Sequence, residues 1–407
     1  MKRLTPEKEA EIIANGSAEI ISIEELSYKI EKARKEKRPL IVKYGADPSA
    51  PDIHLGHVVC LDKLRQIQEF GHRVVFLIGD FTGMIGDPSG RSKTRMPLTG
   101  EEIEKNAETY TTQVSKVLDV DKAVIEYNSK WSTCLSPEDI IRLCSKHTLA
   151  RILERDDFTM RFKSEIPISI HELLYPIFQA YDSVMLKCDM EMGGTDQKFN
   201  FLLARDLQRE YGQEPQVVLM MPLLVGTDGT EKMSKSLGNQ IGITDEPREM
   251  FGKVMSIPDN IMENYYRLLS HLPDDEIDRI FEDVKKSTIN PRDIKMKLAH
   301  IITSFFYSAD VANDCQEEFK RIFSKGGLPD EIEEFAVKTV DGRVWLIGLI
   351  EESGLCQSKS EARRLLRQGA IYLNNRRLSP DEEDVIINNG DILKVGKRRF
   401  VKIIIKP

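Results

Sequence analysis

The segment LIVKYGADPSAPDIHLGHVVCLDKLRQIQEFGHRVVFLIGD, residues 40–80, contains the residue pattern that indicates the fold class. It begins with a short apolar run that the turn-forming pair Asp47–Pro48 closes, which predicts a buried strand. Apolar residues then recur at helical spacing as far as Gly71, and a second apolar run occupies residues 73–80. Strand, helix and strand in this order form a βαβ unit, so we predict a parallel sheet with helices on its faces.

The composition is typical of a globular protein whose charge is unevenly distributed. The chain has 407 residues, of which 41% are hydrophobic and 30% charged, and this length predicts two or three domains. The formal net charge of −8 argues against a protein that coats nucleic acid. Residues 341–407 hold thirteen Lys and Arg against nine Asp and Glu, a net of +4, so the first 340 residues are net −12. We expect a small basic module after an acidic body.

Cysteine usage and hydropathy predict a cytoplasmic protein. The six cysteines are scattered and form no C-x-x-C pair, which fits reduced thiols and neither a disulfide framework nor a zinc knuckle. No run of about 18 apolar residues is present, and the first twenty residues lack the apolar core of a signal peptide. We therefore expect no partner in a membrane.

Further along the chain, the pattern predicts a helix over 171–186, a buried strand over 216–226 and a largely helical, charged segment over 246–323. The last segment has one basic helix and short alternating strands. The predicted fold class is α/β, with a Rossmann-like, doubly wound parallel sheet, then an α-helical domain and a small α+β RNA-binding domain. The predicted domains are 1–245 (catalytic, with an inserted connective segment), 246–330 (helical) and 341–407 (RNA-binding).

His54 and His57 stand where the first strand gives way to the helix. An H-x-x-H pair can be a metal site, a helix cap or an anion site, but no nearby Cys or His supplies a third metal ligand. The position favours an anion, because free N–H groups and the helix dipole attract phosphate at a helix N-terminus. Gly56 would let a ligand lie against the backbone. The spacing alone leaves a structural cap open.

The loop EKMSKSLGN, residues 231–239, carries Lys232 and Lys235 between glycines and follows the strand predicted at 216–226. Two lysines in a polar loop are usually solvated charge. Here the glycines favour a mobile loop that closes two ammonium groups on a polyphosphate.

Together, HLGH and KMSKS resemble the two signature motifs of class I aminoacyl-tRNA synthetases. Attack of an amino-acid carboxylate on the α-phosphate of ATP needs positioning and compensation of charge on the departing pyrophosphate. Histidines at a helix N-terminus and lysines on a closing loop supply both. The resemblance implies ATP with substrate-bound Mg²⁺, and no protein-held metal or organic cofactor.

Tyr175, Gln179 and Asp182 fall at i, i+4 and i+7, on one face of the predicted helix. Such a face can be an internal polar network or the floor of a substrate site. With GMIGDPSG (83–90) and GGTDQ (193–197), it resembles the tyrosyl-tRNA synthetases. The likeness extends from about residue 35 to the C-terminus, and the chain is identified as a member of the bacterial-type family.

The resemblance implies three groups of site residues. The expected L-tyrosine site comprises Asp87, Tyr175 and Gln179 for the α-amino group, Asp182 for the phenolic hydroxyl, and Gln197 for the reacting carboxylate. The expected ATP site comprises Gly45, Asp47, His54, Gly56, His57, Asp196 (toward the ribose), Lys232 and Lys235, of which His54, His57, Lys232 and Lys235 are catalytic. Arg91 and Arg95 are expected near phosphates or the tRNA acceptor end, although a solvated loop explains them equally well.

Lys43 departs from the commonest bacterial pattern, in which a tyrosine at this place shares recognition of the substrate hydroxyl. A subgroup of the family has this lysine, so we keep Lys43 in the expected L-tyrosine site and expect Asp182 to carry more of the discrimination against phenylalanine.

The C-terminal segment has a basic helical stripe of Lys359, Arg363 and Arg367, with Arg364 beside it. A solvated helix face is the simpler explanation of such a stripe in isolation. The net positive charge favours RNA phosphate binding instead, and the stretch resembles a small RNA-binding domain called S-four that a ribosomal protein shares. The resemblance implies contact of these four residues with tRNA(Tyr), and a homodimer.

Three other readings stay open at this point. They are an enzyme similar to tryptophanyl-tRNA synthetase, a non-catalytic RNA-binding protein on a synthetase scaffold, and a nucleotidyltransferase that uses no tRNA. The first lacks this C-terminal module, the second predicts loss of the phosphate-handling residues, and the third leaves the basic module unexplained. We therefore expect a tyrosine–tRNA ligase.

Overall fold

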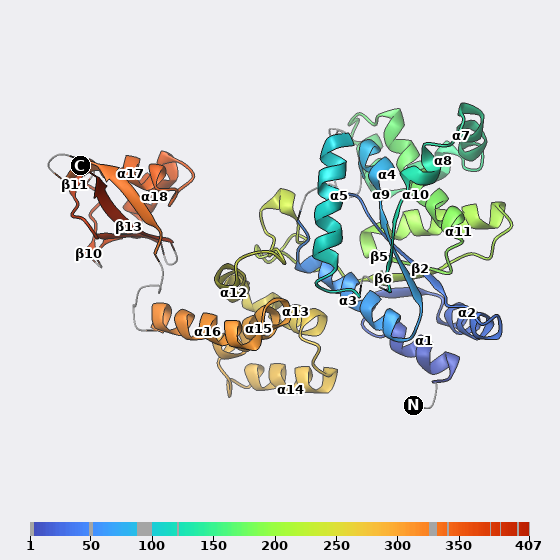
Figure 1. Ribbon diagram of the computed structural model, residues 1–407, viewed down its shortest axis with the longest axis horizontal. Helices are drawn as coiled ribbons and strands as arrows, with labels where there is room; N and C mark the ends of the chain where they lie inside the picture. Colours follow the sequence, from blue (N-terminus) through green and yellow to red (C-terminus); the bar gives the residue numbers. More distant parts are fainter. Residues whose placement is uncertain are drawn as a thin grey trace. The chain divides into compact units, whose positions relative to one another are not determined.

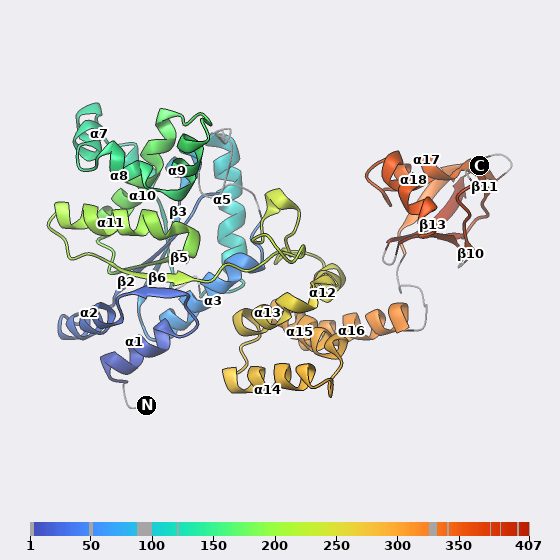
Figure 2. The same ribbon diagram turned by 180° about the vertical axis from the view of Figure 1, so that it is seen from behind.

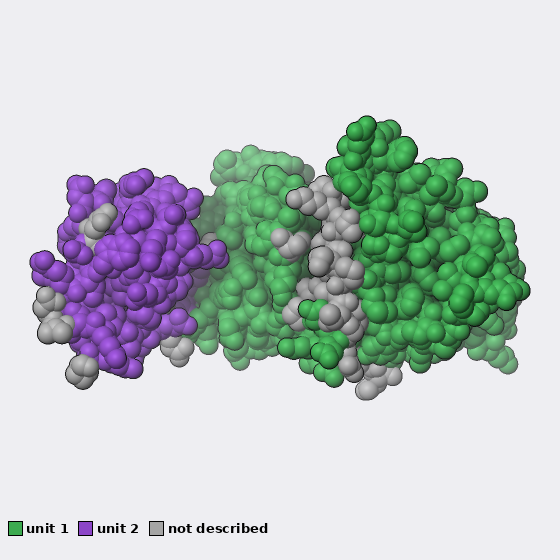
Figure 3. Space-filling view, turned by 90° about the horizontal axis from the view of Figure 1, so that it is seen from above, with its two compact units in different colours: residues 1–316 green, residues 317–407 purple. Residues whose placement is uncertain are grey.

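The computed structural model describes residues 4–48, 52–87, 100–119, 122–324, 332–339, 342–374, 376–382, 384–396 and 399–406. The chain forms two compact units, residues 1–316 and 317–407, which Figure 3 shows in different colours. The domain boundaries predicted at 245 and near 330–341 stay predictions. The segment 246–316 belongs to the same compact unit as the sheet.

The first unit is built on a six-stranded sheet. Its strand order is β1 (Glu19–Ile21), β6 (Val217–Met221), β5 (Met190–Gly194), β2 (Ile41–Ala46), β3 (Arg73–Ile78) and β4 (Val124–Tyr127). The strands β2 to β6 pair in parallel, and β1 is antiparallel to β6. From the central pair the chain winds outward in both directions, through β3 and β4 on one side and through β6 on the other. The predicted doubly wound α/β fold is confirmed.

Helices cover both faces of this sheet, and Figure 1 shows α5 on one side and α11 on the other. The helices that precede or connect the strands are α1 (Pro6–Ala14), α2 (Ile23–Lys35), α3 (Leu55–Glu69), α4 (Asp80–Ile85), α5 (Gly100–Val114), α6 (Ser129–Ser132), α7 (Pro137–Cys144), α8 (Leu149–Leu153), α9 (Asp156–Lys163), α10 (Ile170–Leu186) and α11 (Lys198–Glu210).

The predicted βαβ unit is present as β2, α3 and β3. The apolar positions Val58, Leu61 and Leu64 of α3 are buried, as the helical spacing predicts. The strand predicted over 216–226 ends earlier, at Met221, because Pro222 follows and cannot donate a ladder hydrogen bond.

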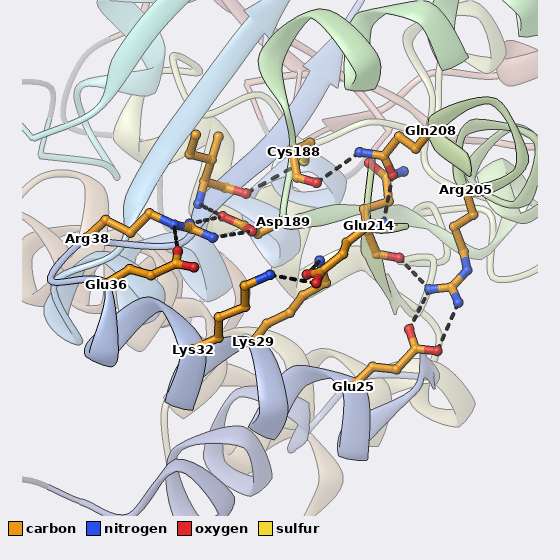
Figure 4. Close-up of polar contacts among 12 residues, drawn as sticks. Glu25, Lys29, Lys32, Glu36, Arg38, Cys188, Asp189, Arg205, Gln208 and Glu214 are labelled. Atoms are coloured by element: carbon orange, nitrogen blue, oxygen red, sulfur yellow. Dashed lines mark hydrogen bonds and ion pairs between the residues drawn. The ribbon is translucent and has the colours of Figure 1, made fainter. Parts of the chain in front are cut away.

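At the amino ends of the strands, ion pairs fasten α2 and α11 to the sheet (Figure 4). We call this group the amino-edge cluster; its charged members are Glu25, Lys29, Lys32, Arg38, Asp189, Arg205 and Glu214. Asp189 is buried and accepts two bonds from the Arg38 guanidinium, at 2.6 and 3.1 Å, and one from the Ile41 N–H at 2.9 Å. The cluster therefore pairs the buried carboxylate of Asp189 and two more exposed glutamates with cations.

The segment predicted to be helical over 246–323 contains α12 (Pro247–Ser256), α13 (Met262–Leu269), α14 (Asp274–Lys285), α15 (Pro291–Phe306) and α16 (Ala309–Ser324). Tyr265 and Tyr266 of α13 are fully buried. Their hydroxyls donate to the Val225 and Ile294 carbonyls at 2.7 and 2.6 Å, so these tyrosines fix α13 to the chain on either side.

The second unit is a small α+β module. It comprises β7 (Glu334–Lys338), β8 (Arg343–Trp345), α17 (Leu346–Glu352), α18 (Lys359–Arg367), β9 (Ile371–Leu373), β10 (Arg376–Arg377), β11 (Asp384–Ile386), β12 (Ile392–Val395) and β13 (Arg399–Lys406). Five strands form a sheet in the order β10-β9-β12-β13-β7, and β8 pairs with β11. Ala362 and Leu366 of α18 join the core beneath the sheet.

Within the ranges that the structure describes, no helix is both long and apolar enough to cross a membrane.

Candidate active site

The predicted site residues gather at the carboxyl edge of the first unit's sheet. Neighbouring strands β2 and β5 are far apart in sequence, and the chain leaves their carboxyl ends toward opposite sides. Open α/β sheets bind ligands in the crevice outside such a switch point. Asp47 lies just after β2, and Asp196 lies in the short 3-10 helix η1 (Thr195–Gln197) that follows β5.

The HLGH motif contacts the KMSKS loop and the segment that follows it, although 178 positions separate His54 from Lys232. Leu55 N–H bonds to the Ile241 carbonyl at 3.0 Å, and Ile243 N–H bonds to the Ile53 carbonyl at 3.0 Å. A Cβ on Gly56 would lie 3.0 Å from the His54 ring and 3.6 Å from Met233 Cβ. The glycine therefore allows the loop and the histidine ring to approach the start of α3.

The two histidines are neutral hydrogen-bonding groups. His54 precedes the first turn of α3, and its backbone N–H donates to His57 Nδ1 at 3.3 Å. That bond leaves the proton of His57 on Nε2. Burial lowers the pKa of His57 to about 4 and holds the pKa of His54 well below its ordinary value. Near neutral pH the pair can therefore donate N–H bonds to phosphate oxygens but supplies no charge.

The positive charge comes from the loop, where both lysines have acidic partners. Lys232 Nζ donates to Asp196 Oδ2 at 2.7 Å, and Lys235 Nζ forms an ion pair with Asp52. Both lysines are more than a third exposed, so these pairs contribute little stability. Their partners lie on either side of the site, beside the HLGH motif and after β5. The loop is thus held over the strand ends.

Asp182 is deeply buried, with 2% of its surface exposed. Trp131 Nε1 donates to its Oδ1 at 2.8 Å, and Asn128 Nδ2 donates to its Oδ2 at 3.2 Å. Burial raises its pKa to about 6, because the nearby charge of Lys43 and the hydrogen bonds from Trp131 and Asn128 compensate the desolvated carboxylate only in part. The carboxylate can accept a further hydrogen bond, since each oxygen has two lone pairs.

Asp47 and Tyr175 join the nucleotide side to the amino-acid side. Tyr175 OH donates to Asp47 Oδ2 at 2.8 Å, and Thr82 Oγ1 donates to Asp47 Oδ1 at 2.7 Å. A Cβ on Gly79 would lie 2.0 Å from Asp47 Oδ1, so only glycine fits there. Asn128 Nδ2 donates to Thr82 Oγ1 at 3.0 Å, which extends this network to Asp182.

Asp87, Gln179 and Gln197 meet through Asn200 and Arg155. Gln197 Nε2 and Arg155 Nη2 each donate to Asp87 at 3.0 Å. Asn200 Nδ2 lies 2.7 Å from Gln179 Oε1 and 2.8 Å from Gln197 Oε1. The structure therefore brings together the residues predicted for the α-amino group and the carboxylate of the substrate. We call all these residues the carboxyl-edge cluster: Asp47, Thr82, Asp87, Asn128, Trp131, Arg155, Tyr175, Gln179, Asp182, Gln197 and Asn200.

Lys43 is fully buried, and its ammonium group is engaged by protein atoms. Its Nζ lies 2.7 Å from Glu191 Oε1, 2.8 Å from Ser183 Oγ and 3.1 Å from the Gln179 carbonyl. An ammonium group has three hydrogens, and these three contacts use them. Direct contact of Lys43 with the substrate stays a prediction, and the observed geometry favours an indirect role through the helix that carries Gln179 and Asp182.

Several members of the carboxyl-edge cluster were missed by the sequence analysis. Asn128 and Trp131 follow β4, whose carboxyl end lies at the same sheet edge, and that position was the available signal. Arg155 lies in the charged run ERDD, which has the composition of a surface turn, yet only 4% of the residue is exposed. The predicted residues Arg91 and Arg95 lie outside the described residues.

The proposed RNA-binding side chains sit on α18, which Ser358 caps by accepting the Glu361 N–H. Lys359, Arg363, Arg364 and Arg367 are exposed, and they lie opposite the buried face of the helix.

Comparison with known proteins agrees with this arrangement. Residues 35–324 match the family model described as tRNA synthetases class I (W and Y), and residues 344–383 match the S4 domain. A tyrosine–tRNA ligase of Moorella thermoacetica is 49% identical over 97% of this chain and 95% of its own. The corresponding protein of Mannheimia succiniciproducens is 50% identical over 97% of this chain and 98% of its own.

The chain belongs to the tyrosyl-tRNA synthetases. A solved tyrosyl-tRNA synthetase from Archaeoglobus fulgidus, in complex with L-tyrosine, shares the fold with a TM-score of 0.62 and 24% identity, over 76% of this chain and 99% of that one. The tyrosyl-tRNA synthetase assignment made from the sequence is confirmed, and the three alternative readings are not favoured.

Proposed function

We propose that this tyrosyl-tRNA synthetase activates L-tyrosine with ATP and transfers the tyrosyl group to the 3′ end of tRNA(Tyr). The observation that carries the proposal is Asp182, a buried carboxylate fixed by Asn128 and Trp131 at the carboxyl edge of the sheet. A buried acceptor in this position suits the phenolic hydroxyl of tyrosine and is left without that bond by phenylalanine.

In the first step, a carboxylate oxygen of tyrosine attacks the α-phosphorus of ATP. The bond from that phosphorus to the bridging oxygen breaks, and pyrophosphate leaves with the bonding electrons. No proton has to move, so the protein contributes position and charge compensation. His54 and His57 donate N–H bonds to phosphate oxygens, while Lys232 and Lys235 exchange their aspartate partners for pyrophosphate oxygens. Mg²⁺ enters with ATP as part of the substrate.

Amino-acid recognition is divided among three places in the carboxyl-edge cluster. Asp182 accepts the phenolic O–H, Asp87 with Tyr175 and Gln179 holds the α-amino group, and Gln197 contacts the carboxylate. Asp47 and Asp196 lie toward the nucleotide, with Gly45 and Gly56 leaving the backbone accessible. In the second step, a terminal ribose hydroxyl of the tRNA attacks the carbonyl carbon of tyrosyl-adenylate, and AMP leaves.

The second unit supplies tRNA binding. Lys359, Arg363, Arg364 and Arg367 form an exposed basic face within the segment that matches the S4 domain, which supports contact with RNA phosphates. Arg91 and Arg95 complete the proposed set near the acceptor end. RNA is the partner that best suits a module of net charge +4 on an otherwise acidic chain.

A homodimer and a cytoplasmic location complete the proposal. Large apolar side chains are exposed on α7, α9 and α10, which lie on the same side of the first unit in Figures 1 and 2. They are Ile141, Met160, Phe162 and Ile170, and Ile170 is 81% exposed. Contact with a second copy would bury them. The six cysteines are free thiols, which suits a reducing compartment.

Tyrosine-dependent exchange of pyrophosphate into ATP tests the proposal directly. We expect purified protein to catalyse exchange with tyrosine, and much more slowly with phenylalanine or tryptophan. Charging of tRNA(Tyr) with labelled tyrosine tests the second step.

Exchange with tryptophan but not tyrosine would refute the substrate assignment, and no exchange with any amino acid would favour a non-catalytic RNA-binding protein. Sedimentation at several concentrations tests the dimer, with Phe162→Glu as the variant expected to be monomeric and Tyr28→Glu, an exposed aromatic on α2, as the matched control.

A further inference from the structure

Trp345 is an exposed aromatic residue on the small second unit. It ends β8, precedes α17 and has 39% of its surface exposed. The next residues, Leu346 and Ile347, are fully buried in the core. The backbone at Trp345 is therefore anchored from one side, while the indole ring stays in contact with solvent. A tryptophan in this setting has an apolar face available to a ligand.

The ring is held against α17 by the absence of a side chain at Gly348. A Cβ on Gly348 would lie 2.7 Å from Trp345 Cε3 and 3.3 Å from Cζ3. Glycine weakens a helix, and α17 has only seven residues, so the close approach explains its presence there. The indole is consequently positioned before any ligand binds, which lowers the entropy lost on binding.

Two cations of α18 lie over the same ring, and a base can occupy that face only when their side chains turn aside. Lys359 Nζ is 5.4 Å and the Arg363 guanidinium carbon 5.9 Å from the ring centroid, within the range of a cation–π contact. Both residues are exposed, and they continue into the basic face that Arg364 and Arg367 complete. Glu351 forms an ion pair with Lys359 at 3.3 Å, which leaves Arg363 as the stronger candidate for a phosphate.

We propose that Trp345 is a base-stacking residue that, with Lys359 and Arg363, binds one unpaired nucleotide of tRNA. The two cations move from the ring to the phosphates that flank the base, and the indole then contacts the face of the base. Proteins bind single-stranded nucleic acid with this combination of aromatic faces and basic groups, and stacking is tolerant of base identity. The inference rests on the proposed role of α18 in tRNA binding and adds to it a residue that provides no charge.

A second aromatic and cationic group in the same unit serves as a matched control. Lys394 Nζ lies 5.7 Å from the Tyr372 ring and 5.3 Å from the Phe400 ring. These residues are direct cross-strand partners on β9, β12 and β13. The residues on both sides of Tyr372 and Lys394 are buried in the core, as is Val401 after Phe400, so the three lie on the sheet face away from the core and from α18. Strand pairing accounts for this group, and we assign it no RNA contact.

Binding of full-length protein to tRNA(Tyr), measured at several salt concentrations, tests the proposal. We expect Trp345→Leu to weaken binding about tenfold and to leave the slope of log K against log salt unchanged, because no charge is lost. Trp345→Phe should retain most of the affinity. Arg363→Gln should reduce the slope by about one, and Tyr372→Leu should have no effect.

Fluorescence provides a readout that requires no change in the second unit. The chain has two tryptophans, so Trp131→Phe leaves Trp345 as the only tryptophan, and its emission can be excited selectively at wavelengths that tyrosine does not absorb. Stacking with a base should quench its emission as tRNA(Tyr) saturates the protein.

Two results would overturn the stacking role and leave the role of α18 intact. One is unchanged Trp345 emission when tRNA(Tyr) saturates the protein. The other is that Trp345→Leu binds tRNA(Tyr) as tightly as the unsubstituted protein while Arg363→Gln binds it more weakly. If neither variant is weakened, both the stacking role and the assignment of α18 to tRNA fail.

Discussion

Asp182 and Asp189 are buried aspartates near opposite edges of the same sheet, and their partners differ. Asp189, in the amino-edge cluster, accepts two bonds from the Arg38 guanidinium and one from a backbone N–H. Asp182, in the carboxyl-edge cluster, accepts bonds from an indole and an amide, both neutral. A carboxylate paired with a cation is already compensated. A buried carboxylate held by neutral donors retains free energy that a ligand hydroxyl can use, and this distinguishes a binding group from a structural one.

Lys43 adds a third case, a fully buried ion pair with Glu191 between the two edges. Lys43→Met should lower the free energy of unfolding by about 3–5 kcal/mol, because it leaves the Glu191 carboxylate buried without its cation. Urea denaturation measures the change. The double variant Lys43→Met/Glu191→Gln should recover most of the loss, and failure to recover would show that the pair is not the reason for it.

Lys235→Ala should have the largest effect on catalysis. We expect the rate of pyrophosphate exchange to fall by about 10²–10³, since the substitution removes charge compensation at the departing pyrophosphate. Tyrosine binding and stability should change little, because the side chain is partly exposed. Stopped-flow measurement of adenylate formation checks the rate. Lys253→Ala, which removes a lysine paired with Asp245, is the control, and an equal loss in both variants would remove the specific role of Lys235.

Asp182→Ala tests whether the buried carboxylate that is held by neutral donors recognises the tyrosine hydroxyl. The specificity constant for tyrosine should fall by about a hundredfold, whereas that for phenylalanine should change much less, because a hydrogen bond to a charged acceptor is lost only with tyrosine. Exchange kinetics with both amino acids measure the two constants. Equal losses would show that Asp182 does not recognise the hydroxyl.

Arg38→Met tests whether the buried carboxylate of Asp189, which is paired with a cation, serves stability and not substrate binding. It should lower the free energy of unfolding by about 1–2 kcal/mol, less than for a fully buried pair because the Arg38 side chain is 37% exposed. Tyrosine-dependent exchange should be unaltered, since the cluster lies at the edge of the sheet away from the site. A change in the Michaelis constant for tyrosine, measured at a temperature where the variant is folded, would contradict this separation.

The pH dependence of tyrosine binding gives the smallest effect. The pKa of Asp182 in the folded protein is raised to about 6, so the ionised acceptor is present above this pH and is lost below it. We expect the specificity constant for tyrosine to fall about fivefold between pH 6 and pH 5, as the ionised fraction of Asp182 does. In Asp182→Asn the profile should be flat over that interval, and a fall of the same size there would assign the titration to another group.

The sequence predicted strands and helices correctly where apolar spacing and turn residues indicated the same element. The apolar runs at 40–45 and 73–80 and the helical spacing between them predicted β2, α3 and β3, and the expected HLGH position at the start of α3 was correct. The strand predicted to reach residue 226 was too long, because apolar residues continue beyond Pro222 in a loop. Apolar pattern reports burial, and a buried loop has the same pattern as a buried strand.

The residues that orient the predicted site groups needed the tertiary structure. Asn128, Trp131, Arg155 and Asn200 carry no motif of their own, and their partners are 21 to 68 residues away in sequence. Lys43 also needed the tertiary structure. Its place in the sequence predicted a residue of the substrate site, but the folded chain pairs its ammonium group with Glu191.

Local sequence patterns were enough to assign the class of fold and the family, and they predicted the groups that handle phosphate. These depend on short motifs at the ends of strands, where chemistry and spacing coincide. Which buried charges are paired with cations, and which are held by neutral donors, can be seen only in the folded chain. That distinction depends on contacts between distant segments, and it separates the aspartate that fastens the sheet from the aspartate that we propose recognises tyrosine.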